Sequence, residues 1–375
     1  MGHRTARIGV LLVVTAGWLL AGCQSRAHES ALPKIDISRC ATPQPRSSSS
    51  TVADPTSVVS MIQIGANYVG NAVNDVSWSP DGTSLAVAND NSTDQILDPS
   101  TGAARITYRG HSSYETAVAW APGGSVVASA GNDGTVQTWD SSTGRHLRTM
   151  TGNSSRIYGR GWSPDGEKLA TAGWDGSIRI WRASTGTLLA SYQDPSLSAF
   201  NQLSWSPNGA CLAAADADGT VRIINTSSGK LVSSYRGQGS PVWSVAWSPS
   251  GREIASGGGA APSNPSGYSI RIWNAVTGVT VRTLAEGGGP VFALAWSPDG
   301  LRLASGGGLM LLAPPSQPVA PGRFAVTVWN PASGQPTASL SGATNSILAL
   351  AWSPGGTLLA ASSQDGTVHL WSTTS

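Results

Sequence analysis

Charged side chains are scarce in this chain of 375 residues, where Asp, Glu, Lys and Arg make up 12% against about 25% in ordinary domains. The formal net charge is only +2. Nucleic-acid-binding proteins carry a basic patch or stripe that follows the phosphates, and the sequence contains none. We therefore expect no nucleic-acid partner. We also expect a polar surface made mainly of Ser, Thr, Asn and Gly, which suits an exported protein.

Cysteine is equally rare, and its three copies are Cys23, Cys40 and Cys211. Three cysteines do not make a disulfide framework. Cys211 follows Trp205 by six residues, at a position where related segments of the chain carry Lys168 or Glu253. We expect Cys211 to face solvent. Two free thiols at Cys40 and Cys211 are favoured, with a bond between them as the alternative.

Few residues could support catalysis, because only His111, His146 and His369 follow the N-terminal region. The sequence shows no nucleophile beside a base, no metal-ligand spacing and no phosphate-binding loop. The GGG runs that begin at residues 257, 287 and 306 have a loop composition and lack the strand-to-helix context of a cofactor site. The sequence therefore predicts no catalytic site, no metal and no cofactor.

What the chain has in abundance is one short motif. WSPDG or a close variant begins seven times, and the steps between copies are 42, 42, 43, 42, 49 and 56 residues. We call these seven tryptophans the first-strand Trp residues: Trp78, Trp120, Trp162, Trp205, Trp247, Trp296 and Trp352. A fixed period of this size is typical of a repeat architecture.

Each copy contains the signals for four short strands. In the copy at Trp162, Pro164 and Asp165 suit a tight turn and Gly166 suits the position with positive φ. Three further alternating stretches follow, separated by turns such as NDGT and STG. Each repeat is thus predicted to form one four-stranded antiparallel sheet.

This pattern resembles the WD-repeat β-propeller family over residues 56–375. The dipeptide that names the family is complete once, at Trp139-Asp140, and in five of the seven copies its position lies 19 residues after the first-strand Trp. The resemblance implies an all-β, seven-bladed β-propeller. It also implies that four residues form the structural hydrogen-bond tetrad of the second blade: His111, Ser129, Asp133 and Trp139. The other copies lack a matching His, so we expect packing to carry more of the stability there.

The seventh copy ends near Trp371 without a fourth strand. An open sheet edge invites aggregation, and the family closes its ring with a strand from the other terminus. The β-prone run at residues 58–64 precedes the first copy and belongs to no blade. We predict that it pairs with the strand that ends at Trp371.

The N-terminus has the layout of an export signal. A basic start is followed by an apolar run from Ile8 to Leu20 and by LAGC. This ending resembles the lipobox of bacterial lipoproteins, which implies a signal peptide over residues 1–22, lipid on Cys23, and a protein exported to the outer face of a bacterial membrane. An ordinary signal peptide or a signal anchor is the alternative. Residues 23–55, rich in Ser and Pro, are predicted to be a flexible tether.

Three function classes fit a propeller of this composition. The favoured class is a membrane-anchored module, monomeric, that binds a protein or peptide as an interaction scaffold. The alternatives are an extracytoplasmic lactonase or hydrolase with its site at the channel mouth, and a spacer without a ligand. The enzyme is less favoured because no acids or histidines converge in the repeat alignment, although fold alone does not decide function.

The binding face is predicted from two long loops and a set of large side chains. The loops at residues 257–268 and 306–324 cause the two long steps of the repeat, and in the family such loops share the partner face. Several copies carry a large apolar residue four positions before the first-strand Trp, and Trp174 precedes a turn on the same face. The predicted partner-binding residues are therefore Tyr158, Trp174, Trp243, Phe292 and Leu348. Packing between blades is the alternative role for them.

Four consecutive apolar residues, Leu309, Met310, Leu311 and Leu312, complete the predicted partner site. They lie in a loop rich in Gly and Pro that has no strand alternation to bury them. An exposed patch of this kind is typical of an interaction surface. The alternative is that they plug the channel.

Overall fold

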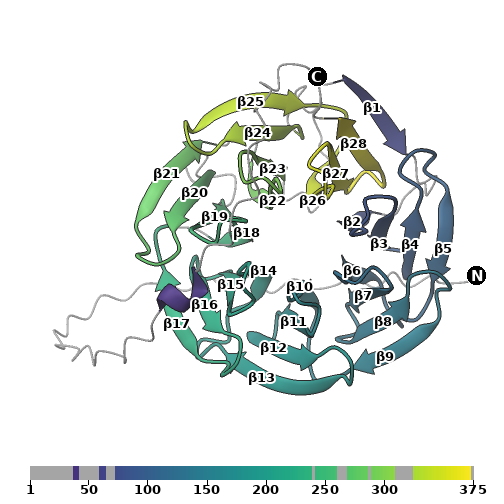
Figure 1. Ribbon diagram of the computed structural model, residues 1–375, viewed down its shortest axis with the longest axis horizontal. Helices are drawn as coiled ribbons and strands as arrows, with labels where there is room; N and C mark the ends of the chain where they lie inside the picture. Colours follow the sequence, from purple (N-terminus) through teal and green to yellow (C-terminus); the bar gives the residue numbers. More distant parts are fainter. Residues whose placement is uncertain are drawn as a thin grey trace, which may run out of the picture. The chain divides into compact units, whose positions relative to one another are not determined.

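The computed structural model describes residues 37–41, 59–64, 72–238, 241–259, 268–285, 289–308 and 324–372. Their strands form seven four-stranded antiparallel sheets, arranged in Figure 1 as the blades of a propeller around a central axis. The prediction of a seven-bladed, all-β propeller is confirmed. Within these ranges, the one helical element is a 3-10 turn, η1 (Ile37–Cys40).

The blades follow the chain in order, and each begins with its innermost strand. Blade 1 contains β2 (Val73–Trp78), β3 (Leu85–Asn89), β4 (Thr93–Leu97) and β5 (Ala104–Tyr108), and blade 2 contains β6 (Glu115–Trp120), β7 (Val126–Gly131), β8 (Val136–Asp140) and β9 (His146–Met150). Blade 3 contains β10 (Ile157–Trp162), β11 (Lys168–Gly173), β12 (Ser177–Arg182) and β13 (Thr187–Gln193), and blade 4 contains β14 (Phe200–Trp205), β15 (Cys211–Asp216), β16 (Val221–Asn225) and β17 (Leu231–Tyr235). Blade 5 contains β18 (Val242–Trp247), β19 (Glu253–Gly258), β20 (Ser269–Asn274) and β21 (Thr280–Ala285), and blade 6 contains β22 (Val291–Trp296), β23 (Leu303–Gly307), β24 (Val326–Asn330) and β25 (Gln335–Leu340). Blade 7 contains β26 (Ile347–Trp352), β27 (Leu358–Ser363), β28 (Val368–Ser372) and β1 (Val59–Ile64).

The WSPDG motif forms the turn between the first two strands of a blade. In blade 3, Asp165 Oδ1 accepts a hydrogen bond from the backbone N–H of Glu167 at 2.9 Å, and Gly166 has a φ of 72°. A side chain is disfavoured at this φ, which explains the Gly. The repeated motif therefore encodes a hairpin whose acidic residue serves the turn.

The core lies between adjacent blades. One cluster joins Ala86 and Ile96 of blade 1 to Val118, Val127 and Trp139 of blade 2. Outer strands are largely exposed, as the burial pattern of β5 illustrates. Each blade therefore buries its faces against its two neighbours, which is why the ring must close.

Closure uses the strand predicted for it. β1 pairs antiparallel with β28, with Val59 opposite Ser372 and Ile64 opposite Val368. The innermost strands of blades 7 and 1, β26 and β2, also contact one another. The predicted pairing with the strand that ends at Trp371 is confirmed for residues 59–64, whereas Val58 lies outside the described residues.

The expectation for the two later cysteines is wrong. Cys40 and Cys211 form a disulfide, with Cα atoms 5.4 Å apart, and Cys211 is fully buried instead of facing solvent. The reason is that η1, the purple helical turn beside β16 and β17 in Figure 1, packs against Cys211, whereas the equivalent residues Lys168 and Glu253 are partly exposed. One segment of the predicted tether is thus covalently bound to blade 4.

Several predicted features lie outside the described residues. These are the segment 1–22, Cys23, and the apolar residues Leu309, Met310, Leu311 and Leu312. In the part of the chain that is described, no helix is long and apolar enough to cross a membrane.

Candidate binding surface at the channel mouth

One position of the repeat creates a hollow at one end of the innermost strands. In every blade the residue four places before the first-strand Trp lies at a register shift of the pairing between the first and second strands. Such a β-bulge turns a side chain out of the regular alternation. We call these seven positions the bulge residues: Asn74, Thr116, Tyr158, Asn201, Trp243, Phe292 and Leu348.

All seven bulge residues line a single hollow of about 390 Å³, which we call the channel mouth. The remaining lining residues include Asp75, Arg160, Gln202 and Trp174. Each innermost strand contributes one bulge residue, so the sequence repeat places seven side chains around the channel mouth.

The polar bulge residues are occupied by contacts between blades. Asn74 donates to the carbonyl oxygen of Glu115 in blade 2 at 2.6 Å. The hydroxyl of Thr116 donates to the carbonyl oxygen of Ile157 in blade 3, and Asn201 donates to that of Val242 in blade 5 at 2.8 Å. These side chains clamp neighbouring innermost strands together.

The three aromatic bulge residues are arranged differently, and with Trp174 they form two aromatic pairs. The rings of Trp243 and Phe292 meet edge to face with centroids 5.7 Å apart, and the rings of Tyr158 and Trp174 are 5.3 Å apart. Such pairs are favourable geometries for aromatic side chains. Trp174 nevertheless remains 44% exposed, so this pair leaves aromatic surface open to solvent.

A guanidinium borders the second pair. The Cζ atom of Arg156 lies 5.7 Å from the ring centroid of Trp174 and 5.7 Å from that of Tyr114. These distances fit cation–π contacts. Arg156 therefore lies at the rim of the channel mouth, where it contacts the rings of Trp174 and Tyr114.

The charges at the channel mouth are paired with each other. Arg160 of blade 3 forms an ion pair with Asp75 of blade 1 and donates to the carbonyl oxygen of Val118 in blade 2. Burial lowers the pKa of Arg160 to about 10, so the guanidinium stays protonated at neutral pH. The Asp75 carboxylate also accepts from the backbone N–H of Val118 at 2.6 Å. The pair links three blades and leaves little net charge for a ligand.

The structure brings five of the predicted partner-binding residues together. Tyr158, Trp174, Trp243, Phe292 and Leu348 all line the channel mouth, and the packing alternative accounts for only part of their surface because Trp174 is exposed. Asn74, Thr116 and Asn201 were missed, although they occupy the same repeat position. The prediction considered only large apolar residues at this position, although the spacing of four residues before the first-strand Trp applies to these polar residues as well.

The four residues of the second-blade tetrad form one hydrogen-bonded chain. His111 Nδ1 lies 3.1 Å from Asp133 Oδ2, His111 Nε2 lies 3.0 Å from Ser129 Oγ, and the Trp139 indole donates to Ser129 Oγ at 3.3 Å. Burial works to raise the pKa of Asp133, but hydrogen bonds from His111 and Thr135 lower it below its usual value. None of these four residues lines the channel mouth.

Three blades without the matching His pair the recurring Asp with a basic side chain of their own third strand, so polar contacts as well as packing hold these blades together. Arg179 pairs with Asp175 at 3.0 Å in blade 3, and Arg222 pairs with Asp218 at 2.8 Å in blade 4. In blade 7, His369 lies 3.4 Å from Asp365. Each partner comes from the third strand, two residues before the family Trp position. The family tetrad takes its His from the segment before the first strand, so it gives no indication of this partner.

Two buried acids lie between blades 1 and 2. Asp94 and Glu115 have no exposed surface. Burial raises the pKa of Glu115 to about 8, and burial together with the charge of Glu115 raises the pKa of Asp94 well above its usual value. Among the residues that the structure describes, no group of three or more His, Cys, Asp or Glu side chains is placed to hold a metal ion.

Comparison with known families agrees with this architecture. The WD40 profile, described as "WD domain, G-beta repeat", matches residues 63–96, 102–140, 144–182, 229–274, 278–308 and 334–372. The profile of the anaphase-promoting complex subunit 4 WD40 domain matches residues 193–250. No curated protein matches the chain.

Proposed function

Because the chain belongs to the WD40-repeat family, whose propellers are commonly protein-interaction scaffolds and typically not enzymes, we propose that it binds a protein or peptide at the channel mouth. One observation carries the proposal. Polar bulge residues bond neighbouring blades together. The large bulge residues at the same repeat position, Tyr158, Trp243, Phe292 and Leu348, instead line one shared hollow.

The chemistry of the channel mouth suits an apolar or aromatic side chain of a partner. Trp174, Tyr158 and the Trp243–Phe292 pair offer aromatic surface, and aromatic anchors dominate many protein interfaces. Asp75 and Arg160, which line the hollow, neutralise each other in an ion pair. Apart from Arg156 at the rim, a strongly charged ligand would find no free counter-ion among the lining residues, whereas a neutral segment loses little on entering the hollow.

The proposal includes export and a lipid anchor on Cys23. Its support is the N-terminal pattern that ends in LAGC and the Cys40–Cys211 disulfide, since disulfides persist in oxidising compartments outside the cytosol. The protein then acts as a monomer, held at the outer face of a bacterial membrane, without a nucleic-acid partner.

Crosslinking capture in intact cells tests the binding function. The variant Trp174→Ser with Trp243→Ser is compared with the control Leu188→Ser with Leu189→Ser, which alters exposed leucines on the outer strand β13. We expect the first variant to lose the neighbours that the wild-type protein captures, and the control to retain them. Equal capture by all three proteins would remove the channel mouth as the binding surface.

A further inference from the structure

The first-strand Trp residues follow two hydrogen-bonding patterns. Five donate the indole N–H to a carbonyl oxygen of the preceding blade, at 2.8 to 3.1 Å: Trp78 to Ala351, Trp162 to Ala119, Trp205 to Gly161, Trp296 to Ala246 and Trp352 to Ala295. Trp120 and Trp247 instead donate to Gly124 and Gly251 of their own turns, at 2.8 and 3.1 Å. The interfaces between blades 1 and 2 and between blades 4 and 5 thus differ from the other five.

At the second exception the space beside the indole is filled by the N-terminal segment. Ile37 and Cys40 pack into a cluster with Cys211, Ile223 and Trp247, which we call the blade 4–5 groove. The amide of Asn208 donates to the carbonyl oxygen of Arg39 at 2.7 Å. Under this cover Trp247 is only 6% exposed. The groove therefore has a known occupant, a single turn of chain.

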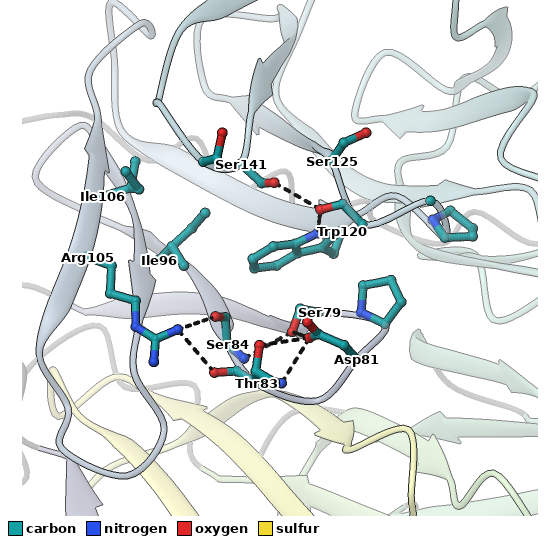
Figure 2. A pocket seen from close by; sticks show the side chains of 15 residues that line it. Ser79, Asp81, Thr83, Ser84, Ile96, Arg105, Ile106, Trp120, Ser125 and Ser141 are labelled. Carbon is teal, nitrogen blue, oxygen red and sulfur yellow. Dashed lines mark hydrogen bonds between the residues drawn. The ribbon is translucent and has the colours of Figure 1, made fainter.

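The first exception has side chains at the equivalent positions, and there the side chain of Arg105 lies over Ser84, whose Oγ accepts a hydrogen bond from Arg105 Nη1 at 2.9 Å. A constant offset of 127 residues relates the two sites: Asp81 corresponds to Asn208, Ser84 to Cys211, Ile96 to Ile223, Arg105 to Val232 and Trp120 to Trp247. These blade 1 and blade 2 residues border a groove of about 720 Å³, the blade 1–2 groove. Figure 2 shows the Trp120 indole facing Ile96 and Ser84 across it.

The turn of blade 2 confirms that this interface is open. A Cβ atom built on Gly82, Gly166, Gly209, Gly300 or Gly356 would lie 3.5 to 3.7 Å from a Pro of the preceding blade, but one on Gly124 meets nothing within 4 Å. Only the turn beside Trp120 stands free in this comparison. The gap is therefore a property of the blade 1–2 interface and not of the repeat.

We propose that the blade 1–2 groove binds a short turn of a partner polypeptide, in the way the blade 4–5 groove holds Ile37–Cys40. The partner turn displaces the Arg105 side chain, which is 46% exposed, from Ser84. It carries a branched aliphatic residue first, to meet Ile96 and Trp120, and a small residue fourth, to meet Ser84. The proposal does not depend on the channel mouth, because the two sites lie at opposite ends of the innermost strands.

The two grooves differ at one polar position, because Asp81 of the blade 1–2 groove stands where the blade 4–5 groove has Asn208. Where Asn208 donates an amide hydrogen to a carbonyl, Asp81 presents a carboxylate that already accepts from Ser79 and Thr83. These hydrogen bonds lower the pKa of Asp81, so the group is an acceptor only. The bound turn therefore presents an N–H to Asp81, where the turn in the blade 4–5 groove presents a carbonyl.

Disulfide capture of a peptide tests the proposal. In full-length protein carrying Cys23→Ser, the variant Ser84→Cys places a thiol at the position of Cys211, and Lys168→Cys places one at the equivalent position of blade 3. Lys168→Cys is the matched control because the next blade there has the other pattern, with Trp205 bonded to Gly161. The probe is the capped pentapeptide ISRCA, the sequence of residues 37–41.

We expect Ser84→Cys to retain half of its peptide at a mercaptoethanol concentration about tenfold higher than Lys168→Cys does, because non-covalent contacts raise the effective concentration of the bound thiol. Replacing the Ile of the peptide by Ser removes the difference. Equal capture by the two variants overturns the proposal, as does disulfide-linked dimerisation of Ser84→Cys without peptide, which would assign the groove to a second copy of the chain. Unchanged melting of Ser84→Cys verifies that the groove is intact.

Discussion

Cys40 and Cys211 are joined by a disulfide although 171 residues separate them in sequence. The bond lies beside Trp247, between blades 4 and 5. Together with the pairing of β1 and β28, it binds the N-terminal part of the chain to the ring at two places. The N-terminal region is therefore part of the propeller's stability and not only a linker.

Replacing both Cys40 and Cys211 by Ser should lower the free energy of unfolding by about 2–5 kcal/mol, because the bond restricts a long loop of the unfolded chain. Denaturant titration of the variant and the wild-type protein measures the change. Cys23→Ser is the control and should leave the midpoint unaltered. A double variant as stable as the wild type would show that η1 contributes nothing to the ring.

Stability should fall as the pH rises from about 5 to about 8, since Glu115 and Asp94 have raised pKa values in the folded state. The folded protein then binds more protons than the unfolded chain, and each such group contributes a slope approaching about 1.4 kcal/mol per pH unit. Glu115→Gln cannot ionise and should flatten the decline. Exposed Glu167→Gln is the control, and an unchanged slope in Glu115→Gln would refute the assignment.

His111→Ala should lower the free energy of unfolding by about 1–3 kcal/mol, because it removes the buried hydrogen bonds that His111 makes with Ser129 and Asp133. His146→Ala, at an exposed position of β9, should cost at most about 1 kcal/mol. Thermal and denaturant unfolding of the two variants gives the comparison. Equal costs would mean that the tetrad adds no stability to blade 2.

Lipid attachment should depend on one thiol. Cells that express the protein and are fed a radiolabelled fatty acid should incorporate label into the wild type, and Cys23→Ala should abolish it. Cys40→Ala is the control, because that thiol is oxidised in the folded protein. Label retained by Cys23→Ala would place the lipid elsewhere or exclude it.

The blade count and the closing strand follow from the sequence because they depend on local signals. The WSPDG turns, the strand alternation and the unpaired run at residues 58–64 are all contained in short windows of the chain. Part of the lining of the channel mouth is predictable for the same reason. Tyr158, Trp243, Phe292 and Leu348 all lie four residues before a first-strand Trp.

The features that the sequence does not predict depend on contacts between distant segments. The burial of Cys211 requires η1 to pack on blade 4, and no repeat position records where a unique segment will bind. The Arg179–Asp175 and Arg222–Asp218 pairs were overlooked because a different strand supplies the partner of a recurring Asp. The indole hydrogen bonds of Trp120 and Trp247 to their own turns are not predictable from the WAPGG and WSPSG motifs in which these residues lie.

The most direct test of the channel mouth is photo-crosslinking from Trp174 and from Leu301. Each side chain is 44% exposed, but Trp174 borders the channel mouth whereas Leu301 follows a WSPDG turn at the other end of an innermost strand. A benzophenone amino acid placed at position 174 in intact cells should give a discrete crosslinked protein that disappears when Trp243→Ser is added. The same amino acid at position 301 should not give that product. A product of equal yield at both positions, or one that persists with Trp243→Ser, would contradict the account.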